Sequence, residues 1–218
     1  MNKVWIGIVS VIAVFAFIFL AYKFTNTPND KTFPELTTVS SSDHSKWATG
    51  SAAKKNVLLE FSDFQCPACK SFAEFIKAEI EASGSANAEI MKNVTFVYRH
   101  FPLAQHAQAE PAAFAAEAAG KQGKFYEYSD VLFAKQEEWA EKKDAVNKFE
   151  TYAKDLGLDM DKFKKDRDSQ EVKDKVKADL LSGQQSEVNA TPTFYFNGKK
   201  LGPINSFEDF LKPLRDLK

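Results

Sequence analysis

The sequence predicts an α/β fold in which strands near both ends of one domain flank a long helical block. Three observations support this prediction. A short apolar run at 57–61 is typical of a buried strand and leads into a helical pattern. A second such run lies at 94–98, and strand signals return at 193–201 after a helical pattern that fills about 104–186. With 218 residues, 44% of them hydrophobic, the chain can bury one good-sized core.

The first element is an apolar, uncharged segment, Val4–Ala21, which lies between Lys3 and Lys23. As a helix it would extend about 27 Å, close to the thickness of a bilayer's hydrocarbon region. It is also longer than a typical signal-peptide core. We therefore predict a signal-anchor at 1–23 with the main domain outside the cytoplasm. The Thr-, Ser-, Asn- and Pro-rich stretch at 24–46 is predicted to be a flexible linker.

The main domain, predicted at 47–218, begins with the strand at 57–61, and the sequence Cys66-Pro67-Ala68-Cys69 follows a short turn. Proline is favoured at the first helical position, where its missing N–H costs nothing. The apolar residues that continue at helical spacing are Phe72, Phe75, Ile76 and Ile80. Cys66 is therefore expected at a helix N-terminus, with Cys69 one turn further in and more buried.

The strand at 94–98 precedes the helical block, whose Lys-, Asp- and Glu-rich second half indicates a solvated face. The stretch 193–201, with Asn197-Gly198 at its centre, predicts a β-hairpin with a type I′ turn. Ser206 is expected to cap a last amphipathic helix. The net charge of −1 gives no electrostatic footprint for nucleic acid.

The cysteine pair carries the chemistry, because the chain has only two cysteines. It has neither a disulfide framework nor a second cysteine pair for a thiolate metal site. The free N–H groups and the dipole at a helix N-terminus stabilise a thiolate. We therefore predict that Cys66 is the nucleophile and Cys69 the resolving thiol of a reversible disulfide. The alternative is a static disulfide or two idle core thiols.

Glu60 is the third predicted catalytic residue. Alternation in its strand points it inward, beneath the helix that carries the cysteines. A buried carboxyl has a raised pKa and can exchange a proton near neutral pH. The alternative is an edge-strand residue that faces solvent.

In this order the elements resemble the DsbA-type thiol–disulfide oxidoreductases of the thioredoxin-fold superfamily, and the resemblance covers roughly Trp47 to Leu217. It implies a thioredoxin-like fold with an inserted helical domain at about 104–186. The motifs that carry it are Glu60-Phe61-Ser62-Asp63-Phe64-Gln65-Cys66-Pro67-Ala68-Cys69, Arg99-His100-Phe101-Pro102-Leu103 with His106, Gln122-Gly123-Lys124-Phe125, and Ala190-Thr191-Pro192-Thr193-Phe194.

The resemblance also implies roles for residues around the cysteines. Glu60 would serve Cys69, and Pro67 and Ala68 would support the active site. Thr191 and Pro192 would line the substrate groove, with Pro192 as a cis-proline packed against the cysteines and the backbone of Thr191 free to pair with an extended substrate.

The implied activity is an extracytoplasmic thiol–disulfide oxidoreductase that needs no cofactor beyond the Cys66–Cys69 disulfide. Its partners would be cysteine-containing exported proteins and a membrane protein that reoxidises it. No dimerisation segment is evident, so we expect a monomer. We predict no metal site: His100 and His106 could complete a Cys₂His₂ set, but we expect them to bond to backbone instead.

Two departures from the best-known enterobacterial DsbA affect the expected redox strength. Ala68 stands where that protein has His, and Thr191 stands where it has Val. Because Ala68 can neither hydrogen-bond a thiolate nor add charge, we predict a potential between the thioredoxin and DsbA extremes. Three alternatives remain open: a disulfide reductase or isomerase on the same fold, a copper-handling CxxC protein, and a docking module with vestigial cysteines.

Overall fold

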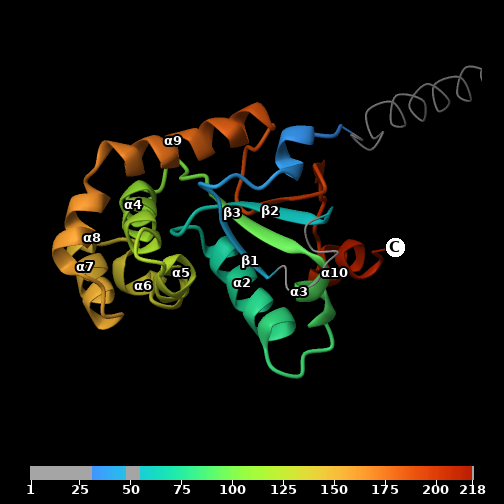
Figure 1. Ribbon diagram of the computed structural model, residues 1–218, viewed down its shortest axis with the longest axis horizontal. Helices are drawn as coiled ribbons and strands as arrows, with labels where there is room; N and C mark the ends of the chain where they lie inside the picture. The colour runs from blue at the N-terminus through green and yellow to red at the C-terminus, as the bar shows by residue number, and fades with distance from the viewer. Residues whose placement is uncertain (1–30, 48–54, 218) are drawn as a thin grey trace, which may run out of the picture. The chain divides into compact units, whose positions relative to one another are not determined.

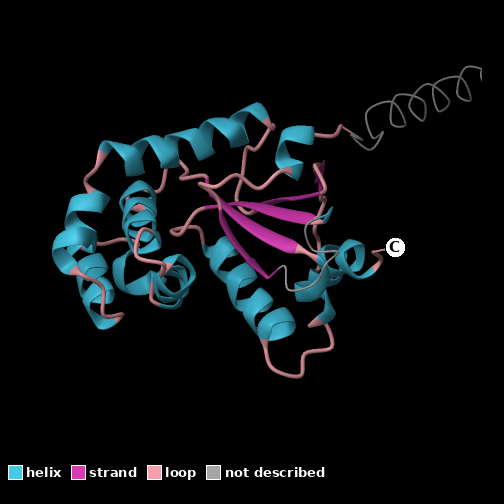
Figure 2. Ribbon diagram, in the orientation of Figure 1, coloured by secondary structure: helices cyan, strands magenta, loops and turns pink. Residues whose placement is uncertain are grey.

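A five-stranded mixed sheet lies at the centre of the computed structural model, which describes residues 31–47 and 55–217 (Figure 2). The order of the strands is β1-β3-β2-β4-β5. β2 and β3 are parallel, and the other neighbouring pairs are antiparallel. The strands are β1 (His44–Trp47), β2 (Val57–Ser62), β3 (Thr95–His100), β4 (Thr193–Phe196) and β5 (Lys199–Lys200).

Helices connect these strands and form a separate block between β3 and β4. α4 to α8 gather beside one end of the sheet, and α9 leads the chain back to β4 (Figure 1). Outside the block, the helical elements are η1 (Pro34–Thr37), α2 (Pro67–Ile76), the π-helical turn η3 (Lys77–Glu81), α3 (Glu89–Asn93) and α10 (Phe207–Arg215). Inside the block they are α4 (Ala109–Gly120), α5 (Phe125–Ala134), α6 (Gln136–Trp139), α7 (Ala145–Asp155), α8 (Met160–Arg167) and α9 (Gln170–Gln185).

Local sequence signals place three of these elements as predicted. Cys66 is the N-cap of α2, with φ −74° and ψ 122°, and Pro67 occupies the first helical position. Asn197 and Gly198 both have positive φ, 50° and 76°, as a type I′ hairpin turn requires. Ser206 caps α10 in a capping box with Asp209.

Both faces of β2 are covered, which explains its nearly continuous apolar sequence. Leu58 packs into the larger core with Cys69, α4, α5 and α10, whereas Leu59 and Phe61 pack on the opposite face against Leu36 of η1. Alternation therefore sends Glu60 and Ser62 to the same face as Leu58, beneath α2. This placement puts two polar side chains inside a hydrophobic core next to the cysteines.

The structure differs from the predicted flexible linker at 24–46. Of that range, Leu36 and Phe33 are buried against the sheet, and His44–Trp47 forms β1 along the edge of β3. The Asp43 carboxylate accepts two hydrogen bonds from the Arg99 guanidinium, at 3.0 and 2.9 Å, which fixes the entry to β1. The folded domain therefore begins before residue 47, and the predicted linker is wrong for its described part.

The predicted signal-anchor at 1–23 lies outside the described residues. Within 31–47 and 55–217, none of the helices combines the length and the apolar character needed to cross a bilayer. The anchor stays a prediction from the sequence.

Candidate active site

The turn between β2 and α2 is fixed by Asp63, whose side chain is buried. Its carboxylate accepts hydrogen bonds from the N–H of Gln65 at 2.7 Å and from the N–H of Leu103 at 2.9 Å. The same carboxylate lies 2.6 Å from Nδ1 of His106. Asp63 thus joins the turn before Cys66 to the loop after β3, so the position of the first cysteine depends on two separate segments.

Cys66 lies at the N-terminus of α2 and is 6% exposed. Its Sγ lies 3.3 Å from the carbonyl oxygen of Thr191, to which the thiol donates. From the helical block, Nε2 of Gln136 donates to the carbonyl oxygens of Phe64 and Cys66, at 2.7 and 3.1 Å. The thiol is therefore held between α2, the segment before β4 and the helical block.

Several donors stabilise the Cys66 thiolate. The largest contribution comes from the Cys69 thiol, and Thr191 and the backbone N–H groups of Cys69 and Ala68 add to it. Together they lower the pKa of Cys66 from 9.0 to about 5 against the opposing effect of burial. The helix N-terminus contributes as predicted, but the neighbouring thiol contributes more. At neutral pH Cys66 is a thiolate, the reactive form of cysteine.

Cys69 is fully buried, 0% exposed, and both cysteines are free thiols. Burial, then the interaction with the Cys66 sulfur, then the charges of Glu60 and Cys66 raise the pKa of Cys69 well above 9.0. The N–H of Asp63 approaches the Cys69 sulfur at 3.5 Å. The two sulfurs therefore differ strongly in acidity, which separates an attacking thiolate from a protonated partner.

We expect the Cys66 thiol to titrate with a midpoint at about pH 5, measured by the ultraviolet absorbance of the thiolate. Because the folded-state pKa is below the ordinary value, the thiolate stabilises the reduced fold fully above about pH 9. That contribution decreases as the pH falls and is lost through about pH 5. The Cys69→Ala variant should titrate at higher pH, since it lacks the largest stabilising contact. A wild-type midpoint between pH 8 and 9 would contradict the stabilised thiolate.

Glu60 is buried in the central strand β2, 5% exposed, so the edge-strand alternative is wrong. Burial raises its pKa from 4.5 to about 7, although Ser62 and Lys46 oppose the shift. A carboxyl with this pKa is partly protonated at neutral pH and can give or take a proton. Its catalytic role stays a prediction.

The peptide bond between Thr191 and Pro192 is cis, as the resemblance implied. Thr191 lies against Cys66 through its carbonyl oxygen and is 9% exposed. The structure thus brings Thr191 together with Cys66, and Pro192 follows Thr191 across the cis bond. The substrate groove along this segment stays a prediction.

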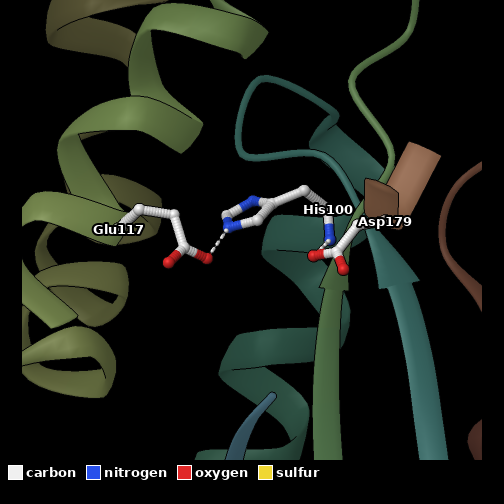
Figure 3. Close-up of side chains that lie close together, drawn as sticks. All are labelled: His100, Glu117 and Asp179. Carbon is white, nitrogen blue, oxygen red and sulfur yellow. Dashed lines mark hydrogen bonds and ion pairs between the residues drawn. The ribbon is translucent and has the colours of Figure 1, made fainter. Parts of the chain in front are cut away.

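The two histidines bond to carboxylates, so the expectation that they bond to backbone is wrong. His106 pairs with Asp63, and Nε2 of His100 lies 2.9 Å from Oε1 of Glu117. Figure 3 shows the His100 ring directed at Glu117, with Asp179 on the other side, at the His100 backbone. The N–H of His100 donates to Asp179 at 3.1 Å.

His100, Glu117 and Asp179 come close enough together to be a candidate cation site. Each of these groups, however, already has a protein partner. Both oxygens of Asp179 bind the Lys175 ammonium, at 2.7 and 2.6 Å. Glu117 also binds Nε2 of His44, at 3.0 Å. The arrangement is that of a satisfied buried polar network.

Sequence reasoning missed Asp63 and Gln136. An aspartate at the end of a buried strand, just before a helix N-terminus, is a recognisable turn signal and could have identified Asp63. Gln136 gives no such signal, because it reaches Phe64 and Cys66 from about 70 residues away.

The site has two thiols at the N-terminus of the helix that follows the central strand, and the first thiol lies against the residue before a cis-proline. This arrangement defines a protein of the thioredoxin class.

The comparisons agree with this class. The family model described as thioredoxin matches residues 42–216 of the chain, and the chain belongs to the thioredoxin family. Because the match begins at residue 42, it includes β1 and supports an earlier domain start than the sequence predicted. Among curated proteins, the chain is 35% identical over 150 residues to the Na(+)/H(+) antiporter NhaA 3 of Salinispora tropica. That alignment covers 68% of the chain, which spans only 21% of the antiporter's length.

Solved structures give the finer comparison. The chain is similar to α-DsbA1 of Wolbachia pipientis, with a TM-score of 0.67, 19% identity and coverage of 84% of this chain and 94% of that one. It is also similar to MdbA, a thiol-disulfide oxidoreductase of Corynebacterium diphtheriae, with a TM-score of 0.64, 18% identity and coverage of 85% and 96%. These matches confirm the predicted DsbA-type fold with its inserted helices. MdbA is described as a thiol-disulfide oxidoreductase, which is the enzyme class that the sequence predicts for this chain.

Proposed function

We propose that this chain is a DsbA-type thiol–disulfide oxidoreductase that forms or exchanges disulfides in exported proteins outside the cytoplasm. The observation that carries the proposal is the asymmetric cysteine pair: a stabilised thiolate at Cys66 beside a fully buried Cys69 thiol. The predicted signal-anchor at 1–23 would tether the domain to the membrane. A membrane redox partner would take the electrons from the reduced cysteine pair and so restore the Cys66–Cys69 disulfide. The enzyme would act as a monomer.

In the oxidising direction, a substrate thiolate attacks Cys66 of the Cys66–Cys69 disulfide. A substrate–Cys66 disulfide forms, and Cys69 leaves with the electron pair. A second substrate thiolate then attacks the substrate sulfur of this mixed disulfide, so that Cys66 leaves as a thiolate. The substrate gains a disulfide, and two electrons pass to the enzyme.

The acidity of Cys66 favours this direction over the reductase alternative. Contacts that stabilise the Cys66 thiolate stabilise the reduced form, and a stabilised reduced form makes the disulfide a stronger oxidant. Cys66 is also a better leaving group when its pKa is low. Thr191, whose carbonyl oxygen lies against the Cys66 sulfur, is placed to contact the substrate chain next to the reacting atoms.

A glutathione redox titration of the wild-type chain tests the proposal, with alkylation of free thiols followed by mass measurement as the readout. We expect a reversible two-thiol couple between the thioredoxin value of about −270 mV and the DsbA value of about −120 mV. The low pKa of Cys66 keeps the potential above the lower limit, and Ala68, whose side chain cannot bind a thiolate, keeps it below the upper one. A potential outside this interval contradicts the prediction, and a pair that neither reduces nor exchanges contradicts the function.

A further inference from the structure

The described part of the chain contains four buried side-chain oxygen or nitrogen atoms without a hydrogen-bond partner. They are the hydroxyl groups of Ser62, Tyr98, Ser186 and Thr191. Thr191 adjoins Cys66, and Ser62 and Tyr98 lie in the core beneath α2. Three of the four thus surround the cysteine pair. Because unpaired buried hydroxyls cost free energy and are rare, their concentration at one place calls for an explanation.

Strand geometry puts Ser62 and Tyr98 on the same face of the sheet as Glu60. Ser62 follows Glu60 by two residues along β2, and Glu60 lies opposite Tyr98 on the parallel strand β3. Leu58 lies on this same face, which packs against Cys69 in the larger core. Ser62 is 1% exposed and Tyr98 3% exposed, so neither hydroxyl can turn to solvent for a partner.

The polar groups around Glu60 come from five of the elements on this face. They are Lys46 from β1, Ser62 from its own strand, Tyr98 from β3, Cys66 and Cys69 from α2, and Tyr126 from α5. Among these, Ser62 is the group that acts on Glu60, Cys69 and Tyr98 alike. It lowers the pKa of each of the three, while burial is the largest cause and raises it in every case. Because Ser62 also shares its face of the sheet with Glu60 and Tyr98, its hydroxyl lies near all three groups without bonding to any of them in the dithiol structure.

We propose that the Ser62 hydroxyl carries a proton between the Glu60 carboxyl and the Cys69 sulfur during disulfide exchange, and that the Tyr98 hydroxyl, which is also unpaired in the dithiol structure, binds and positions it during this step. The inference rests on the proposed function and names how the buried thiol is protonated. A serine hydroxyl suits the task because it donates one hydrogen bond and accepts others. Its lack of a fixed partner in the dithiol structure leaves it able to rotate between the two groups.

A substrate thiolate forms a bond to the Cys66 sulfur, the Cys66–Cys69 bond breaks, and the electron pair leaves on Cys69. The Ser62 hydroxyl proton moves to the Cys69 sulfur, and the Glu60 carboxyl proton moves to the Ser62 oxygen. Cys69 becomes a thiol, Glu60 becomes a carboxylate and Ser62 is unchanged. Reoxidation runs the same transfers in reverse.

The test measures single-turnover reduction of the Cys66–Cys69 disulfide by dithiothreitol in the wild type and in Ser62→Ala. We expect the variant to react at least about tenfold more slowly, since a positioned proton donor contributes 10²-fold or more in many enzymes. Corrected for the thiolate fraction of dithiothreitol, the wild-type rate should fall as the pH rises through about 7, where Glu60 loses its proton. Ser62→Ala should lose this fall.

Ser186→Ala is the matched control, because it also removes an unpaired buried hydroxyl but at the end of α9, where the Tyr195 hydroxyl binds its carbonyl oxygen. It should react like the wild type. Tyr98→Phe should give a rate between those of the wild type and Ser62→Ala. Neither serine variant should lose stability, since each removes a buried oxygen that has no partner.

A double-mutant cycle separates a relay from two independent effects. Glu60→Gln, Ser62→Ala and the double variant should share one slow rate, because each breaks the same path. Additive losses, or a Ser62→Ala rate and pH profile equal to those of Ser186→Ala, would overturn the inference. A wild-type rate for Tyr98→Phe would overturn the part assigned to Tyr98. If instead the wild-type disulfide does not exchange at all, the proposed function itself fails.

Discussion

Cys66→Ser is expected to abolish disulfide transfer, whereas Cys69→Ser is expected to trap a covalent adduct with a disulfide-containing peptide. In Cys66→Ser the stabilised thiolate at the N-terminus of α2 is missing. The remaining Cys69 is fully buried, so a substrate cannot reach it. Without the Cys69 thiol, nothing within the chain can release the peptide from Cys66. Intact-mass measurement should show one peptide added to Cys69→Ser and none to Cys66→Ser.

Both variants should oxidise a dithiol peptide on the order of 10³-fold or more below the wild type, the scale on which removal of a nucleophile acts. Cys69→Ala is the companion variant, because it places no hydroxyl in the buried site and should behave like Cys69→Ser. Adduct formation by Cys66→Ser would reverse the two roles. Rates within tenfold of the wild type in both cysteine variants would favour the docking module with vestigial cysteines.

The parts of this site that the sequence predicts are those whose signals are local. Pro67 directly after Cys66 and the apolar spacing behind it specify where α2 begins, and Asn197-Gly198 specifies the hairpin turn. Glu60 could be placed inside the core because its neighbours in β2 are apolar on both sides. Each of these inferences uses residues within one element.

The parts that the sequence could not predict depend on contacts between distant segments. The stretch that forms β1 is polar and has no strand alternation, and it becomes a strand because β3 offers it an edge and Arg99 holds Asp43. His100 meets Glu117 only because α9 packs against both α4 and β3 and brings the two elements near each other. Glu117 in the alanine-rich second half of α4 was the available signal, and its meaning depends on which residues lie opposite it.

Glu117 links three parts of the domain, and its removal is expected to cost more stability than that of other charges on the helical block. His44 of β1 and His100 of β3 lie 3.0 and 2.9 Å from its two carboxylate oxygens. The His44 ring also stacks on Phe125 of α5, with 3.6 Å between ring centroids. Removing one partner of a buried hydrogen-bonded network typically costs about 1–3 kcal/mol, because the other partners stay buried without it.

Glu117→Ala should therefore lower the free energy of unfolding by about 1–3 kcal/mol in urea at pH 7, while Glu110→Ala, which changes an exposed acid on the same helix, should change it by about 0.5 kcal/mol or less. The two histidines, hydrogen bonding first and charge second, hold the pKa of Glu117 well below 4.5 against the effect of burial. The carboxylate therefore contributes its stability above about pH 4.5 and loses it as the pH falls further. The contribution of Glu117 to the difference in unfolding free energy between the wild type and Glu117→Gln should be constant from pH 7 to 5. It should shrink below pH 4.5. Equal stabilities of Glu117→Ala and Glu110→Ala at pH 7 would show that the network between β1, β3 and α4 contributes nothing to the fold.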